Sequence, residues 1–253
     1  MKWLPVSPVT IPLLSLLSLL LLWVAAAELT ADPEILPMPH ALARPFWREL
    51  SSGALPYHLA HTGLRVLWAF ALAMTIGTAL GLIMGSYPAV DRWLDPWLVV
   101  FLNLPALVLI VLCYLWIGLN ETAAIVAVTL NKIPNVTTIL REGVRARDPN
   151  LRAMAQVFGM RRLTYLRHVL IPQLAPFIGA AARSGIAVIW KIVLVVEFLG
   201  RSNGVGFQIH LYFQLFNVAL VLVYSLSFIA VMLLVEWLLL QPVERHVRRW
   251  RTS

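Results

Sequence analysis

Cysteine and charge are both scarce in this sequence. The single cysteine, Cys113, lies within an apolar run, so the chain cannot form an internal disulfide. Only 13% of the 253 residues are charged and 60% are hydrophobic, whereas soluble globular proteins carry about 25% charged residues. The mean hydropathy is +0.81. This composition excludes an ordinary soluble domain and predicts an integral membrane protein.

Two kinds of catalytic motif are also missing. The sequence has no Gly-x4-Gly-Lys-Ser/Thr phosphate-binding loop, so any ATP hydrolysis must be supplied by another chain. It offers no nucleophile–base constellation either, and we therefore rank a membrane enzyme last among the possible functions. His40, His58 and His61 invite a metal interpretation, but no cysteine accompanies them. We expect solvated loop histidines and no metal site.

The formal net charge of +8 would suggest a nucleic-acid partner in a soluble protein. Here the basic residues fall in loops and tails, where membrane topology and anionic headgroups explain them. No basic surface interleaved with aromatic residues, of the kind that single-stranded nucleic acid needs, is present. We therefore expect a lipid bilayer and no nucleic acid as the partner of these charges.

Six apolar segments are each long enough to cross a bilayer as a helix, which takes about 20 residues. The fold class is therefore an all-α membrane protein with six transmembrane helices. These helices are expected at residues 9–27, 63–86, 97–117, 123–140, 177–199 and 215–240. The first ends in Ala25-Ala26-Ala27, which resembles a signal-peptidase site. Its apolar run exceeds the 7–15 residues usual for a signal, so we favour a retained helix over a cleaved one.

The basic residues predict the topology. If both ends of the chain lie in the cytoplasm, only Arg44, Arg48 and Arg201 fall in segments outside it, and most other Lys and Arg lie inside. The chain then divides into an N-terminal transmembrane helix, an extracytoplasmic loop, a five-helix core and a basic cytoplasmic tail. The corresponding residues are 1–27, 28–61, 62–240 and 241–253.

A polar insert, residues 141–176, separates the fourth and fifth apolar segments. It holds seven arginines, Arg141, Arg145, Arg147, Arg152, Arg161, Arg162 and Arg167. Charges this dense cannot lie in hydrocarbon, so the insert projects into water. Apolar residues at helical spacing predict two short helices with a chain reversal near Gly159, and Pro172 predicts a break before the fifth helix. The insert could lie on headgroups through its arginines, or it could dock a soluble partner.

The insert resembles the cytoplasmic motif of binding-protein-dependent ABC importer permeases, Glu-Ala-Ala-x3-Gly-x9-Ile-x-Leu-Pro. Gly159 and Pro172 match its glycine and proline without a gap, and Ala153 stands where the family has glutamate. Further stretches resemble the branch that imports nitrate, taurine and alkanesulfonates. They include Leu36-Pro37-Met38-Pro39, His61-Thr62-Gly63-Leu64-Arg65, Trp116-Ile117-Gly118, the residues Arg183, Trp190 and Glu197, and Gly204-Val205-Gly206.

This resemblance implies that residues 141–176 form a coupling loop that docks on a separate ATPase subunit. The docking residues would be Arg152, Ala153, Met154, Ala155, Val157, Phe158, Gly159, Arg161 and Arg162. The resemblance also implies an ATP-binding-cassette ATPase dimer that carries ATP and Mg, an extracytoplasmic solute-binding protein and a second permease copy, all at the bacterial inner membrane. The chain itself is then not an enzyme and holds no cofactor. A self-contained secondary transporter or channel stays as the alternative, although the two halves show no repeat.

Polar residues within apolar segments usually face a bundle interior or a water-filled cavity. The candidates for a solute path are Asn103, Asn131, Lys132, Arg183, Lys191 and Glu197. Arg183 and Glu197 lie about four turns apart on nearly one helix face, so they could mark two ends of a polar seam. Lys191 points elsewhere. All six could instead serve as structural contacts between helices.

Glycines recur at every fourth residue in the second apolar segment, at Gly77, Gly81 and Gly85. Small residues at this spacing allow another helix to approach closely. The partner could be a helix of the same chain or a second subunit, and the sequence does not distinguish between them.

Overall fold

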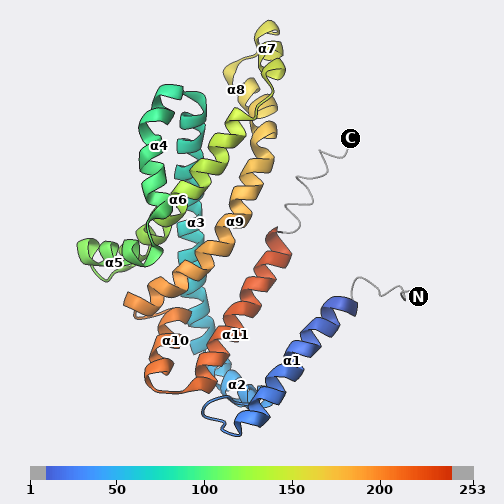
Figure 1. Ribbon diagram of the computed structural model, residues 1–253, viewed down its shortest axis with the longest axis vertical. Helices are drawn as coiled ribbons and strands as arrows, with labels where there is room; N and C mark the ends of the chain where they lie inside the picture. Colours follow the sequence, from blue (N-terminus) through green and yellow to red (C-terminus); the bar gives the residue numbers. More distant parts are fainter. Residues whose placement is uncertain (1–9, 241–253) are drawn as a thin grey trace.

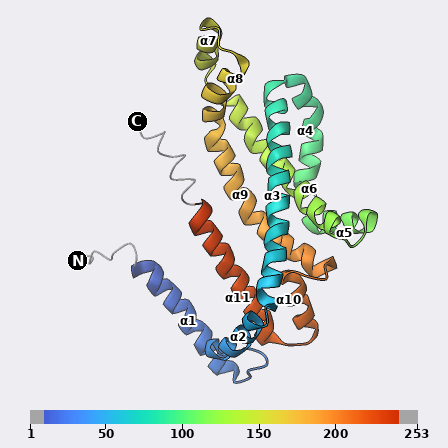
Figure 2. The same cartoon turned by 180° about the vertical axis from the view of Figure 1, so that it is seen from behind.

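The computed structural model describes residues 10–240, which form helices joined by short turns and contain no strand. Three long helices make the centre: α3 (Ala54–Ser86), α6 (Glu121–Arg145) and α9 (Ile171–Gly200). Both views show them running side by side along the long axis (Figures 1 and 2). Two short helices of the polar insert cap one end, which we call the loop end. The helices α2 (Ala43–Ser51) and α10 (Val205–Gln214) lie at the other, the α10 end.

The glycine repeat of α3 lies directly against α6. A Cβ atom added at Gly81 would lie 2.6 Å from the Cβ atom of Leu140 and 2.8 Å from the Thr137 carbonyl oxygen. Gly77 and Gly85 meet α6 side chains equally closely. The glycines therefore allow two helices of one chain to pack with their backbones almost in contact. The sequence left open whether these glycines contact a helix of the same chain or a second subunit. The structure shows that they contact a helix of the same chain.

The third expected span is two helices instead of one. α4 (Pro88–Asn103) and α5 (Ala106–Ile117) meet at an angle of 99°, and α5 turns away from the bundle axis (Figure 1). Pro105 cannot donate a helical hydrogen bond, and it holds Leu104 in an extended conformation with φ −72° and ψ 122°. The sequence places Asn103 and Pro105 as an interruption within the span expected at residues 97–117, and the structure has a sharp bend there because the proline ends the first helix.

Two other expected boundaries also change. The loop expected before residue 215 contains the helix α10, and the last span is α11 (Val218–Val235), which continues into the π-helical turn η3 (Glu236–Leu240). On the N-terminal side of α3, the loop expected at residues 28–61 contains the 3-10 turn η1 (Pro39–Leu42) and α2.

The described residues contain four helices that are long and apolar enough to cross a membrane. They are α3, α6, α11 and a continuous helix at residues 162–200, whose main part is α9. The bent pair of α4 and α5 would make a fifth. The helix α1 (Thr10–Thr30) is also apolar, and it lies apart from the central helices in both views. From Leu14 onward its leucines are exposed, as expected for side chains that face lipid.

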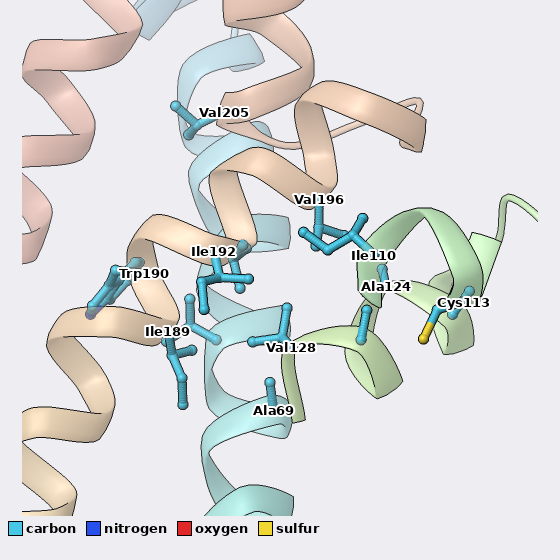
Figure 3. Close-up of a cluster of buried hydrophobic side chains, with 14 of the residues drawn as sticks. Ala69, Ile110, Cys113, Ala124, Val128, Ile189, Trp190, Ile192, Val196 and Val205 are labelled. Atoms are coloured by element: carbon cyan, nitrogen blue, oxygen red, sulfur yellow. The ribbon is translucent and has the colours of Figure 1, made fainter. Parts of the chain in front are cut away.

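The main apolar core lies where α3, α5, α6 and α9 converge, towards the α10 end (Figure 3). Ala69, Val128 and Ile189 are almost fully buried there, and the cysteine Cys113 packs at its edge without a disulfide. At the loop end, ionic contacts between helices add to the apolar packing of Gly85 against Val144 and of Gly143 against Phe177. The Arg141 side chain contacts the carboxylates of Asp91 and Asp95, which fastens α6 to the start of α4.

Candidate functional site

The polar insert folds as a helical hairpin at the loop end. Its first helix, α7 (Pro149–Val157), begins at Asp148, whose side chain accepts a hydrogen bond of 2.8 Å from the Asn150 backbone N–H. Its end is closed by a hydrogen bond of 3.0 Å from the Met160 N–H to the Ala155 carbonyl, and Gly159 adopts φ +58°. The chain reversal expected near Gly159 is therefore present, and its left-handed backbone suits glycine.

The second helix of the hairpin continues into α9. α8 (Arg162–Tyr165) passes into the π-helical turn η2 (Leu166–Leu170), and together with α9 they form one helix of 39 residues. The break expected at Pro172 is absent. The proline lies in the first turn of α9, where the π-helical turn already replaces the regular hydrogen-bond pattern, so its missing N–H interrupts nothing further.

Most residues expected to dock an ATPase are exposed on this hairpin. Val157 and Phe158 are 85% and 74% exposed at its tip, and Leu163 beside them is 77% exposed. Ala155 is the exception, because it is buried on the inner face of α7 and holds the turn through its carbonyl. The remaining expected docking side chains are exposed: Arg152, Ala153, Met154, Arg161 and Arg162. An apolar tip flanked by arginines is thus presented to the surroundings.

A second cluster lies at the α10 end, around Glu197 of α9. Its side chain is fully buried and accepts hydrogen bonds from the Thr62 hydroxyl (2.9 Å), the Arg65 guanidinium (2.6 Å) and the Gly206 backbone N–H (2.8 Å). Arg65 also binds Glu121 with two hydrogen bonds, of 2.6 and 2.9 Å. The cluster therefore joins α3, α6, α9 and the start of α10 in one buried ionic network.

The polar seam whose ends Arg183 and Glu197 could mark stays a prediction, but the network shows which residue pairs with Glu197. The partner of Glu197 is Arg65, which lies 132 positions away in the sequence and was assigned to the edge of a span. Arg183 is exposed on α9, outside the Glu197 network. One signal for this pairing was visible in the sequence, because Thr62 and Arg65 belong to a stretch that resembles the importer branch.

Two glycines let the loop after α9 reach the buried carboxylate. A Cβ atom at Gly204 or Gly206 would overlap the Glu197 side chain, and Gly204 has φ +110°. The Gly204 N–H donates to Nδ1 of His58 at 3.0 Å. The description of His58 as a solvated loop residue was therefore wrong, since it is a buried side chain of α3 that also contacts Gln208. His40 is exposed, and residues 10–240 show no group of three potential metal ligands.

Further contacts attach α2 to the α10 end. The Tyr224 hydroxyl of α11 donates to the buried carboxylate of Glu49 at 2.9 Å. Burial and this carboxylate together raise the pKa of the neighbouring Tyr212 on α10. The hydrogen bond between Tyr224 and Glu49 therefore joins α2 to α11 beside α10.

A third polar cluster lies within the bundle, between α6 and α9. The Lys132 side chain is 2% exposed, and its ammonium donates to the Asn135 side-chain oxygen at 2.9 Å and to the Ser184 carbonyl at 3.2 Å. Asn131 is half-buried beside it, while Lys191 is exposed on α9. Asn103 is also exposed and bonds its own helix through the Val99 carbonyl at 2.8 Å. The expected path residues are thus not gathered in one place.

A family model described as binding-protein-dependent transport system inner membrane component matches residues 77–248. The chain belongs to this family. It is an ABC transporter permease, a multi-pass inner-membrane component of a transport system, as the resemblance implied. Membership in this family removes the self-contained secondary transporter or channel from the alternatives.

Two individual relatives and one solved structure are also similar to this chain. The permease is 30% identical over 177 residues to the aliphatic sulfonates transport permease protein SsuC of Escherichia coli, covering 68% of this chain and 66% of that one. It is 28% identical over 258 residues to the taurine transport system permease protein TauC of the same organism, covering 98% and 92%. An inward facing structure of the MetNI methionine ABC transporter shares the fold, with a TM-score of 0.59 at 17% identity over 78% of this chain and 94% of that one.

Proposed function

We propose that this permease is the membrane-spanning subunit of an ATP-driven importer. Two copies would form the path for a small anionic solute, which an extracytoplasmic solute-binding protein delivers. An ABC ATPase dimer would bind ATP and Mg and hydrolyse the nucleotide, because the permease sequence has no phosphate-binding loop. The permease would contribute the path and the mechanical connection to that motor.

The anionic solute is supported by two observations. The matched relatives SsuC and TauC are described as transporting aliphatic sulfonates and taurine. In addition, the basic residue Lys132 is buried within the central helices, which suits a negatively charged solute better than a positively charged one.

The proposed topology has six transmembrane helices with both ends in the cytoplasm. α1 and the bent pair of α4 and α5 would join the four long apolar helices to give this number. The arginine-rich hairpin then lies in the cytoplasm, following the bias of basic residues towards that side. A hairpin outside the cytoplasm could not reach an ATPase.

The proposal rests mainly on the exposed tip of the hairpin. Val157 and Phe158 project from the turn at Gly159, and the arginines beside them suit an acidic rim. Full burial of one large apolar side chain contributes roughly 1.5–3 kcal/mol. A groove on the ATPase that covers this pair would therefore gain several kcal/mol from two residues, and aromatic anchors of this kind dominate many interfaces.

The test is co-purification of the ATPase with variants of this tip. Because the Phe158 side chain is 74% exposed, Phe158→Asp should leave the permease folded and inserted but abolish co-elution and solute-driven ATP hydrolysis. Trp116→Ala, in α5 and 77% exposed, is a matched control that should retain both. Normal co-elution and uptake with Phe158→Asp would refute the docking role.

Gly159 offers a second comparison at the same turn. A Cβ atom there meets no atom within 4 Å, so substitutions act through the φ of +58° and not through a clash. Gly159→Val should weaken coupling, because β-branched residues rarely adopt this conformation. Gly159→Asn should preserve it, because asparagine tolerates left-handed backbone. Equal activity of the two variants would show that the turn geometry does not matter for docking.

A further inference from the structure

Lys132 lies midway along α6, one of the helices that are long and apolar enough to cross a membrane. It is about eleven residues from Glu121 at the start of α6, which corresponds to roughly 16 Å, and its distance from the other end of the helix is similar. A charged side chain near the bilayer centre costs a few kcal/mol unless it is compensated. Such a residue is therefore retained for a structural or functional reason.

Among residues 10–240, no acidic side chain forms an ion pair with Lys132. Its two hydrogen-bond partners, Asn135 and Ser184, are both neutral, and no ion pair among the described residues includes it. The acidic groups of the central helices lie at their ends, where Glu197 is already neutralised by Arg65. A buried cation without a carboxylate differs sharply from the fully paired cluster at the α10 end.

The cluster also has more hydrogen-bond donors than acceptors. An ammonium carries three N–H groups, and Lys132 uses two of them within the described structure. The side-chain oxygen of Asn135 accepts from both Lys132 and the Ser184 hydroxyl, the latter at 3.3 Å, so its amide NH2 group remains a donor. An anion with several acceptor oxygens is the ligand that such a donor set favours.

The hydrogen bond from Lys132 to the Ser184 carbonyl crosses from α6 to α9. These are the two helices that the 141–176 loop joins, so a movement of that loop changes their spacing first. The crossing is filled but not crowded, since a Cβ atom at Gly185 would make ordinary van der Waals contacts, 3.4 Å from Cε of Lys132 and 3.5 Å from the Phe70 ring. Separation of α6 from α9 at this level would turn the ammonium towards the opening.

We propose that Lys132 is the intramembrane anion-binding residue of the permease, with the Asn135 amide as a supporting donor. A sulfonate monoanion would take the place of the Ser184 carbonyl when α6 and α9 separate, and that carbonyl would again satisfy the ammonium when the anion leaves. The inference rests on the proposed import function and extends it, because it names the residue that responds to the charge of the solute.

The test uses the purified permease–ATPase complex in lipid nanodiscs. The thermal unfolding midpoint is measured with 1-propanesulfonate and with its neutral analogue 1-propanesulfonamide, at equal ionic strength. The sulfonate should raise the midpoint of the wild-type complex and of Lys132→Arg. In Lys132→Met the apparent affinity should fall at least tenfold, while the sulfonamide response stays unchanged. Arg92→Met removes an exposed positive charge from α4 and should behave as wild type.

A purely structural lysine would give a different pattern. Lys132→Met would then lower the midpoint without solute, and the response to both probes would persist. That result, or a wild-type complex that does not respond to the sulfonate, or an equal loss in Arg92→Met, overturns the inference. If Lys132→Met fails to fold, Lys132→Gln and Asn135→Leu provide the same comparison, with a smaller expected loss for the second.

The failure of this inference and of the import function can be told apart. Co-elution of the ATPase and the effect of Phe158→Asp do not depend on Lys132. A complex that assembles and couples ATP hydrolysis to uptake, but whose sulfonate response is unchanged in Lys132→Met, would retain the function and exclude this residue as the anion site.

Discussion

Replacement of Glu197 by glutamine should destabilise the permease more than any other isosteric change at a carboxylate. One carboxylate oxygen accepts from Arg65, and the other accepts from both the Thr62 hydroxyl and the Gly206 N–H. Glutamine has a single side-chain oxygen, so its NH2 group must face one of these donors. The substitution therefore leaves a buried donor without an acceptor and removes the counter-charge of Arg65.

The magnitude follows from burial. The Arg65 and Glu197 side chains are 2% and 0% exposed, and breaking a buried ion pair on one side costs about 3–5 kcal/mol. Arg65 keeps Glu121, whose side chain is 46% exposed, so part of the charge remains balanced. We expect a loss near the lower limit, about 3 kcal/mol. That is a large share of the roughly 5–15 kcal/mol that stabilises a typical domain.

The assay is reversible unfolding in mixed detergent micelles by titration with sodium dodecyl sulfate, monitored by tryptophan fluorescence. Glu142→Gln is the matched control, because Glu142 pairs with Arg145 while both side chains are about half exposed, and its second partner Arg141 keeps the carboxylates of Asp91 and Asp95. An exposed pair contributes about 0–1 kcal/mol. If the two variants lost stability equally, the argument that burial sets the cost at Glu197 would be refuted.

Two further predictions concern other close contacts. Gly81→Ala should lose about 1–3 kcal/mol of unfolding free energy, because its Cβ would enter α6. Gly179→Ala, which meets open space, should be neutral or gain up to about 1 kcal/mol in the same titration. His58→Ala should cost about 1–3 kcal/mol by leaving the Gly204 N–H without an acceptor. Hydrogen exchange of α10 should then accelerate, whereas exchange unaffected by that change, or an equal effect of His40→Ala, would contradict this role.

Helix positions were largely predictable from the sequence because hydrocarbon requires long apolar runs. The residues at which the helices begin and end were harder to predict. α3 begins at Ala54, ahead of the apolar segment expected at residue 63, and its first turns pack through the buried Leu55 and the hydrogen-bonded side chains of His58 and Thr62. The bend between α4 and α5 had a visible signal in Pro105, but a hydropathy window averages over a single residue and returns one span.

Tertiary pairing was harder to predict than helix position. Hydropathy marks Glu197 as costly in a membrane, yet nothing local shows that its partner is Arg65 on another helix. The same holds for His58, which reads as part of a polar loop until the fold brings the Gly204 N–H to its ring. Local patterns succeeded at the Gly159 turn, because the geometry there depends on neighbouring residues alone.

The positions of the three sites suggest how a loop movement would reach the solute path. α8, η2 and α9 form one uninterrupted helix from Arg162 to Gly200, and such a helix moves largely as a unit along its axis. Glu197 anchors its far end to α3 through a buried ion pair, whereas Lys132 contacts its middle through neutral groups that an anion can replace. A force at the hairpin would therefore swing α9 about the Glu197 cluster and open the contact at Lys132 together with the α6–α9 contacts nearer the hairpin. The ionic network around Glu197 would then be the fixed point about which α9 turns. Glu197→Gln should therefore impair the coupling of ATP hydrolysis to uptake as well as stability, even in the fraction of the permease that remains folded.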